Sequence, residues 1–264
     1  MADTKQNMPF LSHLEELRWR LVKSSAAILV FAIVIFIFTE WIVNTIFLSL
    51  AEPDFPIFRF FCWAFGMCEN EIKIDLQSVE FTGQFGINLM LAIVGGIVVA
   101  FPYIFYQIWS FVKPGLKENE LKTVRGIVWF VSILFFIGIM FGYFIIAPLT
   151  VQFFGNWQLA ETIENNITIS SYLRTIISTV FFTGLLFLLP VVIFIFSKLG
   201  IMTPAWLKKY RKHAIVVILI LSAIITPPDI FTQIIVSIPI ILLYELGILI
   251  SKRVEKNRNR QARS

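Results

Sequence analysis

The sequence has few charged residues, few histidines and few cysteines, and each shortage removes a class of protein. Charged residues make up 15% of the 264 positions, against about 25% in a typical soluble domain. Apolar residues make up 58%, and the mean hydropathy is +0.82. A single soluble core cannot bury that much apolar surface. Collagen, a disordered tail and a disulfide-stapled miniprotein are excluded as well. The composition therefore predicts a polytopic membrane protein.

Enzymatic chemistry lacks the residues that it needs. The only two histidines, His13 and His213, lie in short segments beside apolar runs. The sequence contains no HExxH, GxSxG or P-loop motif, and no nucleophile is paired with a base inside an apolar run. We therefore predict no enzyme activity, no cofactor and no metal site.

Acidic residues are nearly absent from the apolar runs, which argues against an ion-coupled secondary transporter. Such transporters usually carry acids near the bilayer midplane and often contain inverted repeats. Glu40 lies near the outer end of the first run, and Glu245 lies two turns from the inner end of the sixth. No inverted repeat is visible. A transporter of a small solute is kept as the alternative function.

Six apolar runs predict an all-α membrane protein with six transmembrane helices in one membrane domain. A bilayer core of about 30 Å requires about 20 helical residues. The fifth run has only 13 residues before the Pro227-Pro228 pair, which predicts a short hairpin of the fifth and sixth helices. Alternatively, Tyr210 and Lys212 snorkel and extend the fifth helix by a turn. The predicted spans cover residues 21–42, 81–112, 126–149, 171–196, 214–226 and 230–250.

The positions of the basic residues predict that both termini are cytoplasmic. All but three of the 22 Lys and Arg residues lie in the N-terminal segment, the second and fourth loops and the tail. The positive-inside rule assigns these segments to the cytoplasm. We expect a cytoplasmic helix over residues 8–20 and a basic tail over 251–264. Because membrane topology and contact with lipid explain where these basic residues lie, the net charge of +5 predicts no nucleic-acid partner.

The first outer loop, about residues 43–80, contains both cysteines. Cys62 and Cys68 lie six residues apart on the predicted oxidising side, where a disulfide is permitted. Two free thiols are the other possibility, and a metal pair lacks further ligands.

The cytoplasmic segments carry the most informative polar residues. Ser12 and Glu15 have capping-box spacing, which predicts a helix start near Ser12. Glu16 and Arg20 are four residues apart, so their simplest interpretation is an ion pair on one helix face, contributing a few tenths of a kcal/mol. Glu120 lies beyond a Pro-Gly break, where an acid at a helix start is favoured.

Prolines interrupt four of the runs. Each removes a backbone hydrogen bond and bends its helix, and together they predict a concave, curved wall of helices. They are Pro102, Pro148, Pro190 and Pro239.

Five segments, in order, resemble the twin-arginine translocase subunit TatC family. Residues 11–21 resemble its opening HLxELRxRL, and residues 101–111 resemble its PxxxYQxWxF, which Pro114-Gly115-Leu116 and Glu120 continue. Gly142-Tyr143-Phe144 and Pro148-Leu149 fit the end of its third span. Residues 225–233 are similar to its TPPDxxSQ hairpin, with the turn at Pro227, Pro228 and Asp229.

This resemblance implies a function in protein export across the bacterial cytoplasmic membrane. It implies a receptor core that binds the Arg-Arg signal peptides of folded precursor proteins, with transport driven by the proton-motive force. The expected partners are these precursors, single-span TatA- and TatB-type subunits and other copies of the chain itself. The resemblance implies that two acids meet the two arginines, beside neighbouring recognition positions. These signal-peptide positions map onto Glu16, Glu120, Arg18, Arg20, Leu21 and Phe111.

Two further positions follow from the resemblance. Thr226 and Gln233 match a polar cluster that contacts partner subunits, although both could equally cap the hairpin and satisfy its backbone. The family commonly has a Glu in its fourth span, where this sequence has Leu188. Thr179 and Thr183 remain as milder polar groups in that span, and a Thr in a span usually bonds back to its own helix.

Overall fold

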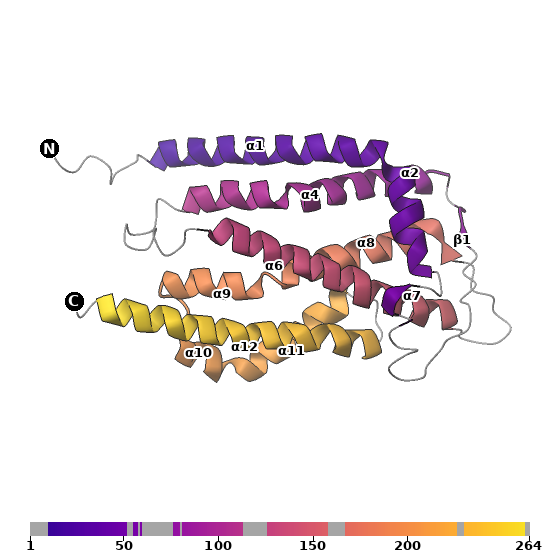
Figure 1. The fold of residues 1–264 in the computed structure, drawn as a ribbon. Coiled ribbons are helices and arrows are strands. Elements are labelled where there is room, and N and C mark those ends of the chain that lie inside the picture. Colours follow the sequence, from indigo (N-terminus) through magenta and orange to yellow (C-terminus); the bar gives the residue numbers. More distant parts are fainter. Residues whose placement is uncertain are drawn as a thin grey trace. The chain divides into compact units, whose positions relative to one another are not determined.

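The computed structural model describes residues 10–51, 55–57, 59, 76–79, 81–112, 126–157, 167–225 and 230–261. Most of these residues are helical (Figure 1). Within them, five stretches are long and apolar enough to cross a membrane: Leu14–Ile37, Gly83–Val112, Ile127–Asn156, Ile169–Lys198 and Thr232–Arg258. The helix at the predicted fifth span, α11 (Arg211–Ile225), has only 15 residues. The prediction of an all-α membrane protein with a short fifth helix is therefore confirmed.

The chain divides into two compact units. The first comprises residues 1–40 and 88–133, and the second comprises residues 41–87 and 134–264. Each unit is described by itself below.

In the first unit, helix α1 (Phe10–Ile37) lies beside helix α4 (Gly83–Val112) (Figure 1). Their backbones come close at Gly96, where an added Cβ would lie 2.8 Å from the backbone nitrogen of Ala32. A hydrogen bond of 2.7 Å between Thr39 Oγ1, two residues beyond the end of α1, and Asn88 Oδ1 of α4 lies in the same unit. Only 6% of the most apolar window of α1 is buried, so this narrow contact accounts for much of its packing.

Helix α1 differs from the two predicted N-terminal elements. It is one unbroken helix that begins at Phe10 and ends at Ile37, because no helix-breaking residue separates the polar first turns from the apolar run. A turn at Phe38 precedes the short α2 (Thr39–Ile42). The chain then passes through the wider, π-helical η1 (Val43–Phe47) and the tighter, 3₁₀-helical η2 (Leu48–Ala51).

Two tyrosines of the second unit hold this irregular segment. The hydroxyl of Tyr143 donates to the carbonyl of Ile46, and the hydroxyl of Tyr172 donates to the carbonyl of Phe47, each at 2.8 Å. A change from π-helical to 3₁₀ geometry leaves carbonyls without their usual helical partners. Because buried backbone groups need partners, the tyrosines stabilise this bend.

We expect Tyr172→Phe to lower the stability of the protein modestly. Tyr172 is 6% exposed, and removing its hydroxyl deprives the Phe47 carbonyl of a buried donor, which costs about 1–3 kcal/mol. Thermal unfolding in detergent measures the effect. Tyr103→Phe is the control, because Tyr103 is 40% exposed and should not change the unfolding temperature. Equal unfolding temperatures for Tyr172→Phe and the parent would contradict the assignment.

Neither the third nor the fourth predicted span is one regular α-helix. Helix α6 (Ile127–Phe141) continues through the π-helical η4 (Gly142–Ile146) into α7 (Ala147–Asn156). Helix α8 (Ile169–Leu186) is separated from α9 (Leu189–Lys198) by a turn at Phe187 and Leu188. Proline is the second residue of both α7 and α9, where its missing N–H costs least.

Pro102 and Pro239 lie inside α4 and α12, and both helices continue through them. Of the four prolines that interrupt the predicted runs, Pro148 and Pro190 coincide with the start of a new helical segment.

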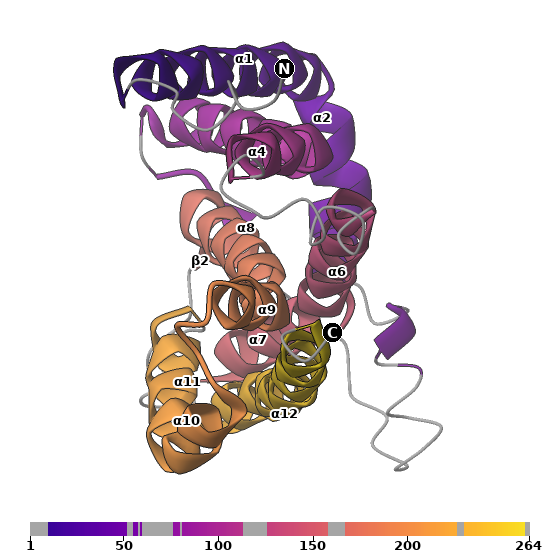
Figure 2. The same cartoon turned by 90° about the vertical axis from the view of Figure 1, so that its left-hand side faces the viewer.

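The core of the second unit lies around α9, α10 (Pro204–Lys209), α11 and α12 (Ile230–Gln261). Figure 2 shows α10, α11 and α12 gathered in one part of this unit. The buried apolar residues of the cluster are Ile146, Ile193, Leu207, Ile218, Val236, Ile240, Tyr244 and Ile248. Buried polar side chains pair across the same helices, as where Ser197 donates to Ser251 at 2.8 Å.

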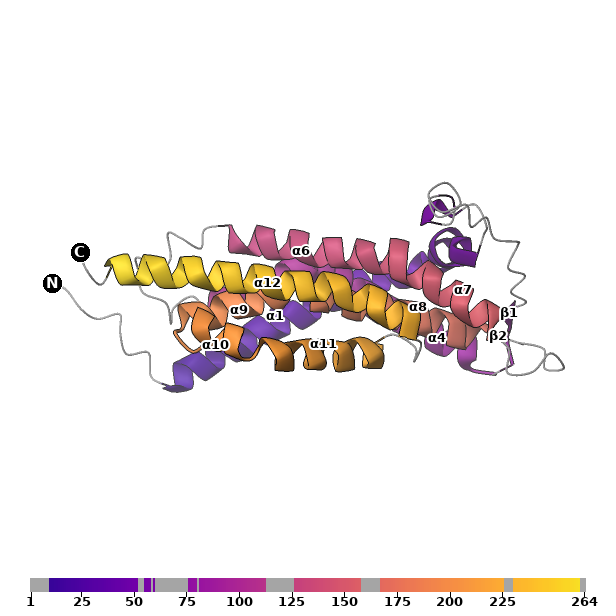
Figure 3. The same cartoon turned by 90° about the horizontal axis from the view of Figure 1, so that it is seen from below.

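The hairpin of α11 and α12 differs in length from the prediction. Helix α11 begins at Arg211, about one turn before Ala214. The fifth helix is therefore extended by a turn at its start, and it is still short. The sixth helix is not short, because α12 continues past Ile250 to Gln261 (Figure 3). Beyond Ile250 it still buries Ser251 and Val254, and this buried stripe keeps the start of the basic tail helical.

A short parallel strand pair was not predicted. Strand β1 (Leu76–Gln77) pairs with β2 (Ile167–Thr168), with Leu76 opposite Ile167. Strands of two residues show no alternating pattern, so the sequence carries no signal for them. The pair connects the two predicted outer loops, and Thr168 Oγ1 then accepts a hydrogen bond from the Ser171 N–H at the start of α8.

Candidate functional site

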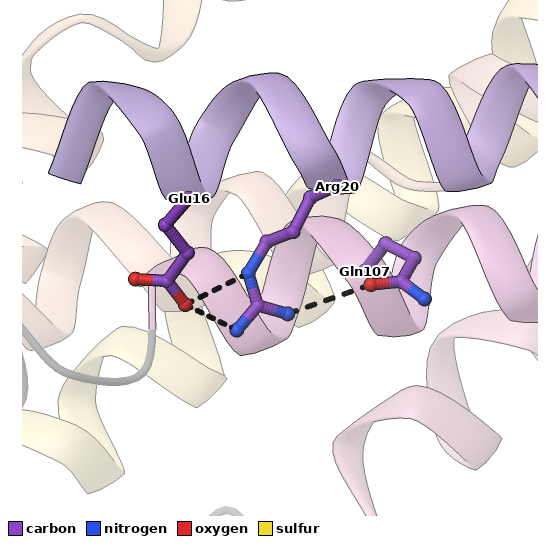
Figure 4. Close-up of polar contacts among 3 residues, drawn as sticks. All are labelled: Glu16, Arg20 and Gln107. Atoms are coloured by element: carbon purple, nitrogen blue, oxygen red, sulfur yellow. Dashed lines mark hydrogen bonds and ion pairs between the residues drawn. The ribbon is translucent and has the colours of Figure 1, made fainter. Parts of the chain in front are cut away.

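An ion pair near the start of α1 is the centre of the candidate site. The Nε of Arg20 donates to Glu16 Oε1 at 3.0 Å, and its Nη2 donates to the same oxygen (Figure 4). The side chains are 22% and 26% exposed. The spacing of four residues brings both onto one face of the helix, so the predicted ion pair is present. The Glu16 carboxylate therefore binds a guanidinium while the Glu16 side chain remains partly exposed.

Helix α4 adds a third member, Gln107. Arg20 Nη1 lies 3.5 Å from Gln107 Oε1 and donates to it (Figure 4). Gln107 is only 6% exposed, and a buried amide requires hydrogen-bond partners. Arg20 thus reaches from α1 to α4. The sequence contained one signal for this, an amide near the end of an apolar run, and no role was predicted from it.

The other sequence-predicted recognition residues lie around this group in different environments. Arg18 and Leu21 are on the exposed surface of α1, where Leu21 is 57% exposed, and Trp19 between them is 60% exposed. Phe111 is partly buried in the last turn of α4. The structure therefore brings Glu16 and Arg20 together and leaves Arg18 and Leu21 on the surface. Glu120 lies outside the described residues.

The predicted partner-contact position Gln233 lies in the hairpin of α11 and α12. Its Nε2 donates to the carbonyl of Leu219 at 3.0 Å, so its amide bonds to the backbone of the neighbouring helix. Contact with a partner subunit stays a prediction. The turn residues Thr226, Pro227, Pro228 and Asp229 lie outside the described residues, as do Cys62 and Cys68.

The fourth predicted span, residues 171–196, contains no Asp or Glu. Leu188 lies in the turn between α8 and α9. Thr183 Oγ1 donates to the Thr179 carbonyl of its own helix at 2.7 Å, as expected for a Thr in a span. Thr179 is different, because its Oγ1 donates to the carbonyl of Ile225 at 3.4 Å. Its hydroxyl thereby joins α8 to the last residue of α11.

Glu245, which the sequence places towards one end of its span, pairs with Arg211. This ion pair links the start of α11 to α12 and is partly exposed. Among the described residues, no group of three or more His, Cys, Asp or Glu side chains could hold a metal ion.

Comparisons with known proteins identify the relatives of this chain. The family model described as "Sec-independent protein translocase protein (TatC)" matches residues 12–239. The "Sec-independent protein translocase protein TatC" of Blattabacterium sp. subsp. Periplaneta americana (strain BPLAN) is 35% identical over 266 residues, covering 98% of this chain and 100% of the relative. The "Sec-independent protein translocase protein TatCy" of Bacillus subtilis (strain 168) is 33% identical, covering 93% of this chain and 89% of the relative.

A solved structure described as "Crystal Structure of Twin Arginine Translocase Receptor- TatC" matches the fold. The two superpose with a TM-score of 0.71 at 29% sequence identity. The match covers 92% of this chain and 99% of the solved chain.

Proposed function

Because the chain belongs to the TatC family of Sec-independent protein translocase proteins, we propose that it receives the Arg-Arg signal peptides of folded precursor proteins. As a family member it is a multi-pass membrane component of the Tat translocase. In the proposal, the signal peptide binds at the cytoplasmic face of the bacterial inner membrane, where both termini lie. The positive-inside distribution of Lys and Arg supports this orientation.

The geometry of Glu16 is the observation that carries the proposal. Its carboxylate oxygen accepts two N–H groups from one guanidinium while the side chain stays 26% exposed. A guanidinium presents its donors in a rigid planar fork, whereas a lysine ammonium is a compact point charge. A carboxylate in this setting is therefore suited to select arginine over lysine.

Two arginines need two acceptors, and Glu120 is the second in this proposal. Exposed ion pairs contribute only about 0–1 kcal/mol each. The acids therefore select and orient the peptide, while its apolar stretch supplies most of the affinity. The exposed Leu21 and the aromatic ring of Phe111 are the proposed apolar contacts, and Arg18 lies beside them.

Later steps follow from the family membership and belong to the same proposal. Single-span TatA- and TatB-type subunits and further copies of the chain assemble around it in membrane lipid, with Thr226 and Gln233 at a partner contact. Transport is driven by the proton-motive force. The spans of this chain carry few acids, which agrees with a passage that is built together with partner subunits.

Binding of an Arg-Arg signal peptide and of its Lys-Lys counterpart tests the proposal. We expect the membrane-embedded protein to prefer the Arg-Arg peptide, and Glu16→Ala and Glu120→Ala each to weaken its binding by about two- to fivefold, as the loss of one exposed ion pair implies. Fluorescence anisotropy of labelled peptides on nanodisc-reconstituted protein measures both affinities.

Glu15→Ala is the matched control. Glu15 is an exposed acid next to Glu16 on the same helix, so it reports the general effect of removing one negative charge. Equal binding of the two peptides, or equal effects of Glu15→Ala and Glu16→Ala, would overturn the proposal.

A further inference from the structure

We propose that Arg20 is an internal occupant of the Glu16 carboxylate, which the arginine of the incoming peptide displaces. Gln107 then retains Arg20 while the peptide is bound. The inference rests on the proposed function of Glu16 and assigns Arg20 a role as a competitor of the ligand, in place of a direct contact with it.

The distribution of the donors of Arg20 supports displacement. Nε and Nη2 donate to Glu16, whereas Nη1 points to Gln107 on the neighbouring helix (Figure 4). The side chain can therefore leave Glu16 and keep one acceptor. The contact with Gln107 is long, at 3.5 Å. It can shorten when the guanidinium is no longer held by its two hydrogen bonds to Glu16.

The acceptor on α4 is well placed for this role. Gln107 is 6% exposed, so neighbouring side chains hold it in place and water does not replace its partners. An amide oxygen has two lone pairs and can accept more than one donor. Because Arg20 keeps a partner throughout, its charge is never left without an acceptor at this partly buried position.

The internal pair is also weak enough to be displaced. An ion pair between residues four apart on a helix shifts an equilibrium by only about twofold. A competitor of this strength lowers the apparent affinity for the peptide by about the same factor, which lowers binding of stray guanidinium groups at rest.

The test is a mutant cycle on peptide affinity in nanodiscs. Arg20→Gln removes the competitor, so the Arg-Arg peptide should bind about two- to threefold more tightly. Lys23→Gln is the matched control, because Lys23 is an exposed cation on the same helix and reports the general effect of removing one positive charge. In a Glu16→Gln background, Arg20→Gln should have no more effect than Lys23→Gln.

Gln107→Leu provides a second arm. It should weaken peptide binding in the parent protein and have no further effect once Arg20 is replaced by glutamine. Weaker peptide binding by Arg20→Gln would show direct contact and overturn the inference, as would an effect equal to that of Lys23→Gln. The proposed function has a separate failure, namely equal binding of Arg-Arg and Lys-Lys peptides by the parent protein.

Discussion

Replacing Gly96 with leucine is expected to separate helix α1 from helix α4. Even a Cβ at this position would lie 2.8 Å from the backbone nitrogen of Ala32 and 2.9 Å from the carbonyl oxygen of Ile28. Backbone atoms inside a helix cannot move aside individually, so the whole of α1 must shift. Overpacking of this kind usually costs about 1–3 kcal/mol, and a branched side chain of four carbons against backbone should exceed that range.

The separation can be measured by a disulfide between α4 and the first residue of α2, which follows α1 after a single turn residue. Thr39 and Asn88 are hydrogen-bonded at 2.7 Å, so the pair Thr39→Cys and Asn88→Cys reports their proximity through oxidative cross-linking. Gly96→Leu should abolish the cross-link and lower the unfolding temperature in detergent. Gly86→Leu is the control on the same helix, because nothing lies within 4 Å of an added Cβ there. An unchanged cross-link with Gly96→Leu would contradict the close approach.

The second large effect is expected at Gly138, where α6 meets α8. An added Cβ would lie 2.7 Å from the Cβ of Phe187 and 2.9 Å from the Cα of Gly184. Phe187 begins the turn that separates α8 from α9, so a side chain at residue 138 pushes directly on the break in the fourth span. Gly138→Ala should already destabilise the second unit, and Gly138→Leu should prevent its native packing.

The direction in which an alanine at residue 138 changes the stability distinguishes this clash from the effect of helix propensity. In an open helical position, Gly→Ala stabilises by up to about 1 kcal/mol, and Gly86→Ala should behave in that way. Gly138→Ala should instead lower the unfolding temperature. If both alanine variants raised the unfolding temperature, the contact between α6 and Phe187 would be looser than the structure describes.

Sequence patterns were most informative where one segment contains all the necessary information. Apolar runs predicted the helices because a backbone in lipid must satisfy its own hydrogen bonds. The spacing of Glu16 and Arg20 predicted their ion pair because the helix period places both on one face. The early Pro227-Pro228 pair predicted the short α11.

Predictions failed for the features that depend on contacts with another segment of the chain. The buried stripe that carries α12 past Ile250 exists only because other elements of the second unit cover Ser251 and Val254. The strand pair of β1 and β2 joins residues about 90 positions apart, and neither strand has a pattern of its own. The acceptors of the Tyr143 and Tyr172 hydroxyl groups lie 97 and 125 positions away in the sequence.

The sequence by itself determined the class of the molecule, its helices and the pairing of Glu16 with Arg20, because composition and helical period are local properties. Only the tertiary structure decided that Gln107 shares Arg20 with Glu16, that Gln233 serves the backbone of α11 and that Thr179 bonds outside its own helix. The physical reason is that a polar side chain in a membrane takes whichever acceptor lies within reach. Packing between helices, at contacts as narrow as that of Gly96, determines which acceptor that is.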